Sequence, residues 1–239
     1  MRVYLTTPAR DFKPNYIVSL IKTLTYFPGK KVNGETVEFA FATHESSDIY
    51  IARNACLFDN HVYGNKLQPL PFNGEPYDWV FWIDSDVRWE PKDIEKLIST
   101  DKDVVSGMVP INPTNMTNVG WFQEDGLARA HGDFFRTPEL AQVDFCGFAF
   151  VAMRKGVLER IGYPWFKATF KEDPLGRVIP NSEDIGLCRR LGDAGVMIWV
   201  DPTVIIPHRK SVVMGLRQAE ELREDFQGVD SGGAMVMGK

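Results

Sequence analysis

Runs of apolar residues and segments of mixed polarity alternate along this chain. Six runs are rich in β-branched and aromatic residues, which favour the extended backbone. Segments with apolar residues every three or four positions lie between several of them. Alternating strands and helices are typical of an α/β domain with a mainly parallel sheet. The predicted strands are Arg2–Thr6, Val37–Ala42, Trp79–Ile83, Val104–Val109, Phe145–Met153 and Val196–Val200.

Four segments carry signals for helix ends as well as helical spacing. They are a helix N-capped by Ser47 with Ile51, Ala55 and Phe58 on one face, Lys92–Ile98 with Pro91 in its first turn, Arg154–Ile161 ending at Gly162, and Glu183–Leu191 capped by Ser182.

Two long stretches have no regular pattern. Residues 112–142 are polar and rich in turn formers, and residues 164–181 mix aromatic side chains with glycine, proline and charges. Irregular loops of this length commonly serve as lids or binding walls. In the second stretch, Trp165 and Phe166 are candidates for stacking on an acceptor sugar, although core packing explains them equally well. We predict one domain over residues 1–210, then a helix near Gly215–Asp225 and a flexible tail within 211–239.

Composition narrows the class of protein. The 239 residues are 44% hydrophobic and 25% charged, as in ordinary globular proteins, and the net charge is −5. A negative net charge argues against a general nucleic-acid or acidic-membrane binder. Three widely spaced cysteines and the lack of a signal peptide or long apolar segment favour a cytoplasmic protein with reduced thiols.

The strongest chemical signal is Asp84-Ser85-Asp86, directly after the apolar strand Trp79–Ile83. In an extended chain, residues i and i+2 point to the same side, so both carboxylates could converge at the carboxyl end of the strand. Two such oxygen donors suit Mn²⁺ or Mg²⁺, and these metals often bind phosphates as well. Aspartate is also common in turns and at helix N-caps, so the motif alone leaves a purely structural interpretation open.

Two further groups carry possible chemistry. Glu183 and Asp184 lie in the first turn of a predicted helix, where acids are favourable for structural reasons and could also serve as a general base or steer an acceptor hydroxyl. His208 follows an apolar run and precedes Arg209 and Lys210, two cations that could neutralise a diphosphate. A lone histidine is more often structural, and the interpretation depends on its neighbours.

The order of the motifs resembles that of a GT-A glycosyltransferase, more narrowly the family-2-type transferases, including phage and large-virus forms. The resemblance rests on Ile51-Ala52-Arg53-Asn54, Trp79–Asp86, Asp144–Phe150, Ser182-Glu183-Asp184 and Pro207-His208, and spans most of residues 1–210. The segment from Ile51 to Val105 also resembles the Anp1/Mnn9-type mannosyltransferases.

The resemblance implies a role for each matching residue. Asp84-Ser85-Asp86 would hold Mn²⁺ or Mg²⁺ on the donor diphosphate and contact the ribose, and His208 would complete the metal site. Asp184 of the Glu183-Asp184 pair would be the base of an inverting reaction. The remaining expected contacts with the nucleotide sugar are Thr6, Thr7, Pro8, Arg53, Gly147 and Lys210.

The expected activity is metal-dependent transfer of one sugar from a nucleotide-diphosphate sugar to a hydroxyl of a glycan acceptor. UDP-hexose is favoured as donor and GDP-mannose is possible, although the usual acidic base-reading pattern is replaced by Ala42-Thr43-His44-Glu45. The Gln-x-x-Arg-Trp motif of processive synthases is absent, which favours single transfers. The alternatives are a nucleotide-sugar-binding module with weak catalysis and, less favoured, a Mg²⁺-dependent phosphatase. The phosphatase motif normally has Thr or Val where this chain has Arg88.

Overall fold

A computed structural model describes residues 1–58, 69–112, 116–123, 126–131, 137–172 and 176–208. Residues 1–209 form one compact unit. The predicted helix near 215–225, the tail and Lys210 lie outside the described residues, and the predicted domain boundary stays a prediction.

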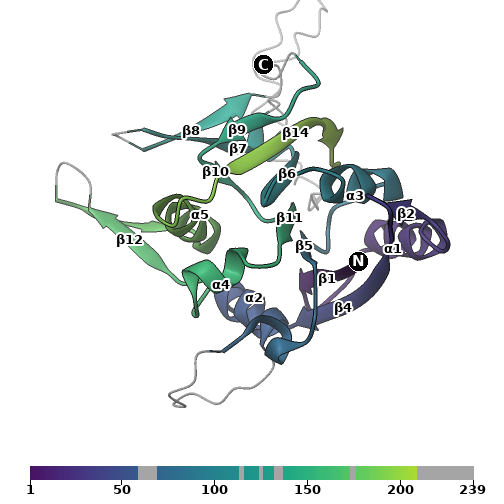
Figure 1. Cartoon of the computed structure of the whole chain (residues 1–239). Coiled ribbons are helices and arrows are strands. Elements are labelled where there is room, and N and C mark those ends of the chain that lie inside the picture. The colour runs from purple at the N-terminus through teal and green to yellow at the C-terminus, as the bar shows by residue number, and fades with distance from the viewer. Residues whose placement is uncertain (59–68, 113–115, 124–125, 132–136, 173–175, 209–239) are drawn as a thin grey trace, which may run out of the picture. The chain divides into compact units, whose positions relative to one another are not determined.

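A seven-stranded sheet forms the centre of this unit (Figure 1). Its order is β4 (Glu38–His44), β1 (Arg2–Pro8), β5 (Trp79–Ile83), β11 (Phe150–Arg154), β6 (Val104–Met108), β14 (Ile198–Ile205) and β9 (Ala141–Val143). β1 pairs in parallel with β4 and β5, and β6 with β14, whereas β11 and β9 are antiparallel to their neighbours. The predicted α/β class with a mainly parallel sheet is confirmed.

Helices cover both faces of the sheet (Figure 1). One hydrophobic cluster joins the sheet to α2 (Ile49–Leu57), α4 (Val157–Ile161) and α5 (Glu183–Asp193). A second cluster, on the other face, joins it to α1 (Pro14–Tyr26) and α3 (Pro91–Ile98). β5 lies between the two clusters with all five residues buried, as expected for a strand covered on both faces.

Smaller elements complete the unit. A three-stranded sheet contains β10 (Phe145–Cys146), β7 (Met116–Gln123) and β8 (Gly126–His131). Two hairpins pair β2 (Lys31–Val32) with β3 (Glu35–Thr36), and β12 (Thr169–Glu172) with β13 (Val178–Asn181). A 3₁₀ turn occupies Pro71–Gly74. Among the described residues, no helix is long and apolar enough to cross a lipid bilayer.

Several predictions about local structure were wrong. The predicted strand Phe145–Met153 is two strands, β10 and β11, which belong to different sheets and are separated by residues 147–149. The residue that caps α2 is Asp48 rather than Ser47. The two supposedly irregular stretches contain β7, β8 and β9 in the first and the β12–β13 hairpin in the second. Polar side chains hid these strands because each sheet buries only part of its surface.

Candidate functional site

The candidate site lies where the parallel strands end. β1, β5, β6 and β14 run in the same direction, so their carboxyl ends share one edge of the sheet. β5 ends at Ile83, and a turn from Asp84 to Val87 follows, with the Val87 N–H donating to the Asp84 carbonyl (3.4 Å). This edge is where open α/β sheets bind ligands. The premise of an extended Asp84–Asp86 segment was wrong, because the turn gives the two carboxylates different neighbours.

Asp86 lies against His208. The His208 Nε2 atom is 3.0 Å from Asp86 Oδ2, and Nδ1 is 3.3 Å from the Pro110 carbonyl oxygen. The backbone fixes this pairing, since Val87 and His208 form an antiparallel bridge and the Arg88 N–H donates to the Pro207 carbonyl (3.0 Å). Segments about 120 residues apart in the sequence are therefore held together at this edge.

Asp84 lies against Arg53 instead. Arg53 extends from α2, with Nη2 3.5 Å from Asp84 Oδ1 and Nε 3.3 Å from Glu183 Oε1. Its side chain is only 5% exposed and lies near the rings of Trp82, Phe148 and Phe166. Among the described residues, its Nε and Nη1 have no hydrogen-bond partner. A buried guanidinium between two carboxylates compensates their charge while they are partly desolvated.

Electrostatic effects link these groups. Asp84 keeps 33% of its side chain exposed, yet the protein atoms packed around it desolvate the carboxylate and raise its pKa to about 6. Arg53 and His208 act in the opposite direction, whereas Asp86 and Asp184 add to the rise. Burial likewise raises the pKa of Glu183, and Arg53 opposes that rise. Asp86, His208 and Asp184 therefore all lie within electrostatic range of Asp84.

Asp184 is held at the start of α5, with Ser182 at the N-cap. Its Oδ1 atom accepts hydrogen bonds from the Ser182 hydroxyl and from the Ile185 N–H (2.7 Å). Its Oδ2 atom faces Gly147, where a Cβ atom would lie 3.4 Å from this oxygen. A side chain at position 147 would therefore contact the Asp184 oxygen that makes neither of these hydrogen bonds.

Other predicted contacts have structural partners. The Thr6 and Thr7 side chains are fully buried, with the Thr6 hydroxyl donating to the Phe81 carbonyl and the Thr7 hydroxyl bonded to the Tyr16 hydroxyl. Pro8 and Ser85 are partly exposed at the same edge.

Of the two interpretations of Trp165 and Phe166, the structure supports core packing and not a stacking surface for an acceptor sugar. Trp165 and Phe166 are 1% and 0% exposed and belong to the core. Their backbone N–H groups donate to Asn54 Oδ1 on α2 (3.0 and 3.2 Å). Asn54, next to Arg53, thus fastens the aromatic segment to the helix that carries the guanidinium.

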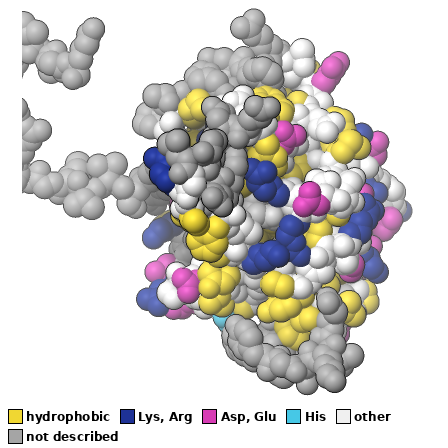
Figure 2. Space-filling model, turned by 90° about the vertical axis from the view of Figure 1, so that its left-hand side faces the viewer, with side chains coloured by type: hydrophobic (Ala, Val, Ile, Leu, Met, Phe, Trp, Pro, Cys, Tyr) yellow, Lys and Arg dark blue, Asp and Glu magenta, His cyan; other side chains and the backbone are white. Residues whose placement is uncertain are grey.

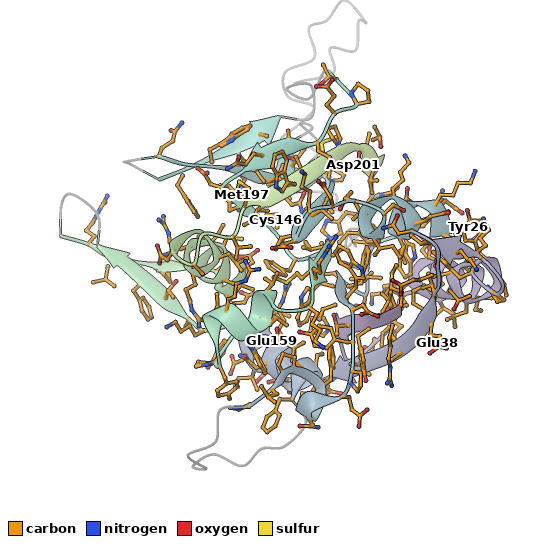
Figure 3. All side chains as sticks on the ribbon, viewed as in Figure 1. Tyr26, Glu38, Cys146, Glu159, Met197 and Asp201 are labelled. Atoms are coloured by element: carbon orange, nitrogen blue, oxygen red, sulfur yellow. The ribbon has the colours of Figure 1, made fainter. Side chains whose placement is uncertain are left out.

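Sequence reasoning missed Asn118, a buried residue of β7. Its side-chain amide bonds to Val109, at the end of β6, and to Gly147. Asn118 lies in a stretch predicted to be irregular, and one asparagine among many turn formers gives no signal. Cys146, labelled in Figure 3, marks the interior position of β10 directly before Gly147.

Basic side chains gather on the face that carries α5 and the β12–β13 hairpin (Figure 2). Both basic residues of α5 contact other parts of the protein. Arg189 stacks over the Phe122 ring at 4.0 Å, and Arg190 donates to four backbone carbonyls between Ile161 and Trp165. Arg189 thus packs α5 against β7, and Arg190 fastens α5 to the end of α4 and the segment that follows it.

The carboxylate and imidazole atoms at this edge are of the kind that binds a divalent cation, but they are not arranged around a common point. No group of three candidate ligands around one point is found among the described residues. A carbonyl only accepts, so His208 Nδ1 carries a proton toward Pro110. Nε2 then either donates to Asp86 or presents its lone pair beside that carboxylate, an arrangement that a bound metal ion would satisfy. Asp86 and His208 therefore fit a metal, whereas Asp84 is turned toward Arg53.

Comparisons with known proteins support the fold. No family model matches the chain, and no curated protein matches its sequence. Among solved structures, A197 from STIV aligns with a TM-score of 0.51 and 13% identity over 92% of this chain and 100% of that one. GalNAc-T7, crystallised with UDP, GalNAc and Mn²⁺, aligns with a TM-score of 0.53 and 10% identity. That match covers 88% of this chain, which spans 44% of the GalNAc-T7 chain. The chain has a GT-A-like fold.

Proposed function

We propose that the protein is a metal-dependent glycosyltransferase that moves one sugar from a nucleotide-diphosphate sugar to a hydroxyl of a glycan acceptor. One observation carries the proposal: an Asp–His pair and a separate carboxylate facing a glycine converge at the ligand-binding edge of a GT-A-like fold. The transfer needs two such parts, one for the departing diphosphate and one for the incoming hydroxyl. The UDP and Mn²⁺ named with GalNAc-T7 add support.

Asp86 and His208 would hold Mn²⁺ or Mg²⁺, with Asp84 as a further ligand. When bound, the metal would supply Lewis-acid stabilisation of the charge that develops on the departing diphosphate. Asp84 lies against Arg53 and would have to turn away from it to reach the metal. Arg53 keeps the surrounding carboxylates compatible with burial by supplying a fixed positive charge.

Asp184 would take the proton of the acceptor hydroxyl through Oδ2. Its other oxygen, Oδ1, is held by the Ser182 hydroxyl and the Ile185 N–H, which fixes the carboxylate plane. Gly147 places no side chain beside this oxygen, and the acceptor sugar would approach it from that side. A carboxylate held in this way would meet the requirement that proton transfer has for fixed geometry. Glu183 turns toward Arg53 and would support the site rather than take the proton.

UDP-hexose remains our preferred donor, with GDP-mannose as the second choice. Asp184 as base fits an inverting reaction; in a retaining one the departing phosphate itself would take the proton. We expect a cytoplasmic enzyme, in keeping with the free, buried thiols of Cys56, Cys146 and Cys188.

The test is release of nucleoside diphosphate from a panel of UDP- and GDP-sugars with Mn²⁺, with and without glycan acceptors. We expect slow hydrolysis of one donor that a chelator abolishes, that Asp86→Ala abolishes, and that Asp184→Asn lowers by about tenfold or more. Asp193→Asn, an exposed change at the far end of α5, is the matched control and should leave turnover unchanged.

Three outcomes would contradict the proposal. Release of phosphate from phosphate esters without turnover of any sugar donor would indicate a phosphatase. Tight donor binding with no turnover for any acceptor would indicate a binding module. Equal losses in Asp184→Asn and Asp193→Asn would remove Asp184 from the reaction.

A further inference from the structure

Asn118 connects the two parts of the candidate site. It lies on β7, in the small three-stranded sheet, and its residue is 4% exposed. The carboxyl end of β6 lies on one side of it, and the turn before β11 lies on the other. Each is joined to Asn118 by two hydrogen bonds.

The first pair of bonds holds the end of β6. The Asn118 N–H donates to the Val109 carbonyl (2.9 Å), and the Val109 N–H donates to Asn118 Oδ1 (2.8 Å). Val109 precedes Pro110, whose carbonyl oxygen is 3.3 Å from His208 Nδ1. Asn118 is therefore connected through Val109 and Pro110 to the His208 ring, which pairs with Asp86.

The second pair of bonds holds the turn at Gly147. The Gly147 N–H donates to the Asn118 carbonyl (2.8 Å), and Asn118 Nδ2 donates to the Gly147 carbonyl (3.0 Å). A Cβ atom at Gly147 would lie 3.4 Å from both Asn118 Cβ and Asp184 Oδ2. The two hydrogen bonds from Asn118 thus fix the position of Gly147 relative to Asp184, the proposed base.

Only a primary amide fits both partners. Val109 presents an N–H, which needs an acceptor, while Gly147 presents a carbonyl, which needs a donor. The asparagine side chain offers one of each at a fixed spacing, and opposite requirements on its two sides fix its orientation. Aspartate would set an oxygen against the Gly147 carbonyl, and alanine would leave two buried backbone groups without these partners.

We propose that Asn118 is a positioning residue that holds the Asp86–His208 pair and the Gly147–Asp184 pair at the separation needed for transfer. The role rests on the proposed function, because the separation matters only if a sugar passes between the two parts. Asn118 itself is buried and bonds to backbone groups of the protein. Its effect on turnover would arise through the loops it joins.

Asn118→Asp and Asn118→Ala test this role, with Thr117→Val as the matched control. Thr117 is the neighbouring residue of β7, is 3% exposed, and donates its hydroxyl to the Ala130 carbonyl of β8 (2.7 Å). Asn118→Ala and Thr117→Val both lose buried side-chain hydrogen bonds, so both should lower stability. Of these side-chain hydrogen bonds, only those of Asn118 lead to the candidate site. Thr117 also bridges Pro110 through its backbone, and Thr117→Val leaves that bridge in place.

Hydrogen exchange measures the connection without requiring any activity. In Asn118→Ala we expect amide exchange to rise by about tenfold in both residues 107–111 and residues 144–149. In Thr117→Val both segments should exchange as in the unaltered protein. Unchanged exchange in either segment of Asn118→Ala would overturn the connection, whatever the protein's activity.

Turnover measures the positioning role. We expect kcat to fall about tenfold or more in both Asn118 variants, while the Kd for UDP with Mn²⁺ stays within about threefold. A kcat loss no greater than that of Thr117→Val would overturn the role. If the unaltered protein turns over no sugar donor, the proposed function and the positioning role both fail, and hydrogen exchange still decides whether Asn118 joins the two segments.

Discussion

Asp84 and Asp86 are separated by one residue but have opposite surroundings. Asp84 lies beside Arg53, whose side chain is 5% exposed and enclosed by aromatic rings. Asp86 lies beside His208, whose side chain is 22% exposed and held by backbone bonds. A closed ion cluster stabilises the shape of a site, whereas a half-open pair of ligands can exchange a partner with solvent. We therefore expect one short motif to contribute to stability through Asp84 and to metal binding through Asp86.

The largest effect on stability is expected in the closed ion cluster of Arg53, Asp84 and Glu183. Arg53→Ala leaves Asp84 and Glu183 partly buried without their positive partner and leaves a space among three rings. We expect the free energy of unfolding, measured with urea, to fall by about 3 kcal/mol. Arg53→Lys keeps the charge but loses the planar group, and should recover part of that loss. Unaltered stability in Arg53→Ala would mean that the two sides do not differ in this way.

The open side should show the reverse behaviour. Asp86→Ala removes one of the two proposed metal ligands, Asp86 and His208. We expect Mn²⁺ affinity, measured by calorimetry, to fall by about tenfold or more. The free energy of unfolding should change by less than about 1 kcal/mol, because partly exposed ion pairs contribute little. Asp101→Asn, which breaks the exposed Asp101–Lys102 pair, is the control for both measurements. A large stability loss with unchanged Mn²⁺ affinity would make Asp86 structural.

Elements with a continuous apolar run or an ordinary amphipathic pattern could be predicted from the sequence. The strand Trp79–Ile83 was predicted with its observed bounds, and α3 differs from the prediction only by including Pro91. α1, which packs near α3, escaped prediction because its polarity is inverted. Ser19 and Thr23 face the core, where they accept hydrogen bonds from the Trp89 backbone and ring N–H groups (3.1 and 2.9 Å). Its exposed face instead carries Ile17, Val18, Ile21 and Leu24.

The candidate site could be predicted in its titratable groups but not in its support. The Asp–x–Asp motif, the Glu–Asp pair and His208 are visible as charges at the ends of apolar runs, and the structure brings them together. Asn118 was invisible because its importance depends on which backbone groups lie on its two sides. The burial of Trp165 and Phe166 was equally hidden, since an aromatic pair in a polar stretch suits a core and a binding wall alike.

A smaller effect tests whether the space at Gly147 matters. In Gly147→Ala the new methyl group would lie 3.4 Å from Asp184 Oδ2 and from Asn118 Cβ, a close contact that the fold can accept. We expect donor turnover to fall by about tenfold, because the methyl group occupies the approach to the base. Stability should change by less than about 1 kcal/mol. Gly192→Ala on α5 meets nothing within 4 Å and serves as the control. Full turnover in Gly147→Ala would place the sugar elsewhere.

The smallest effect concerns the pH response of Asp84, whose pKa is raised to about 6 by desolvation. Between its unfolded pKa near 4 and about 6, the folded protein binds more protons than the unfolded chain. This group therefore adds stability below pH 4 that is lost as the pH rises through about 6. Without metal, Asp84→Asn should flatten that part of the stability curve. In the unaltered protein, Mn²⁺ binding should weaken by a few-fold below pH 6, since a proton competes for the same carboxylate. Identical pH dependence of Mn²⁺ binding in Asp84→Asn would show that Asp84 stays with Arg53 and leaves the metal to Asp86 and His208.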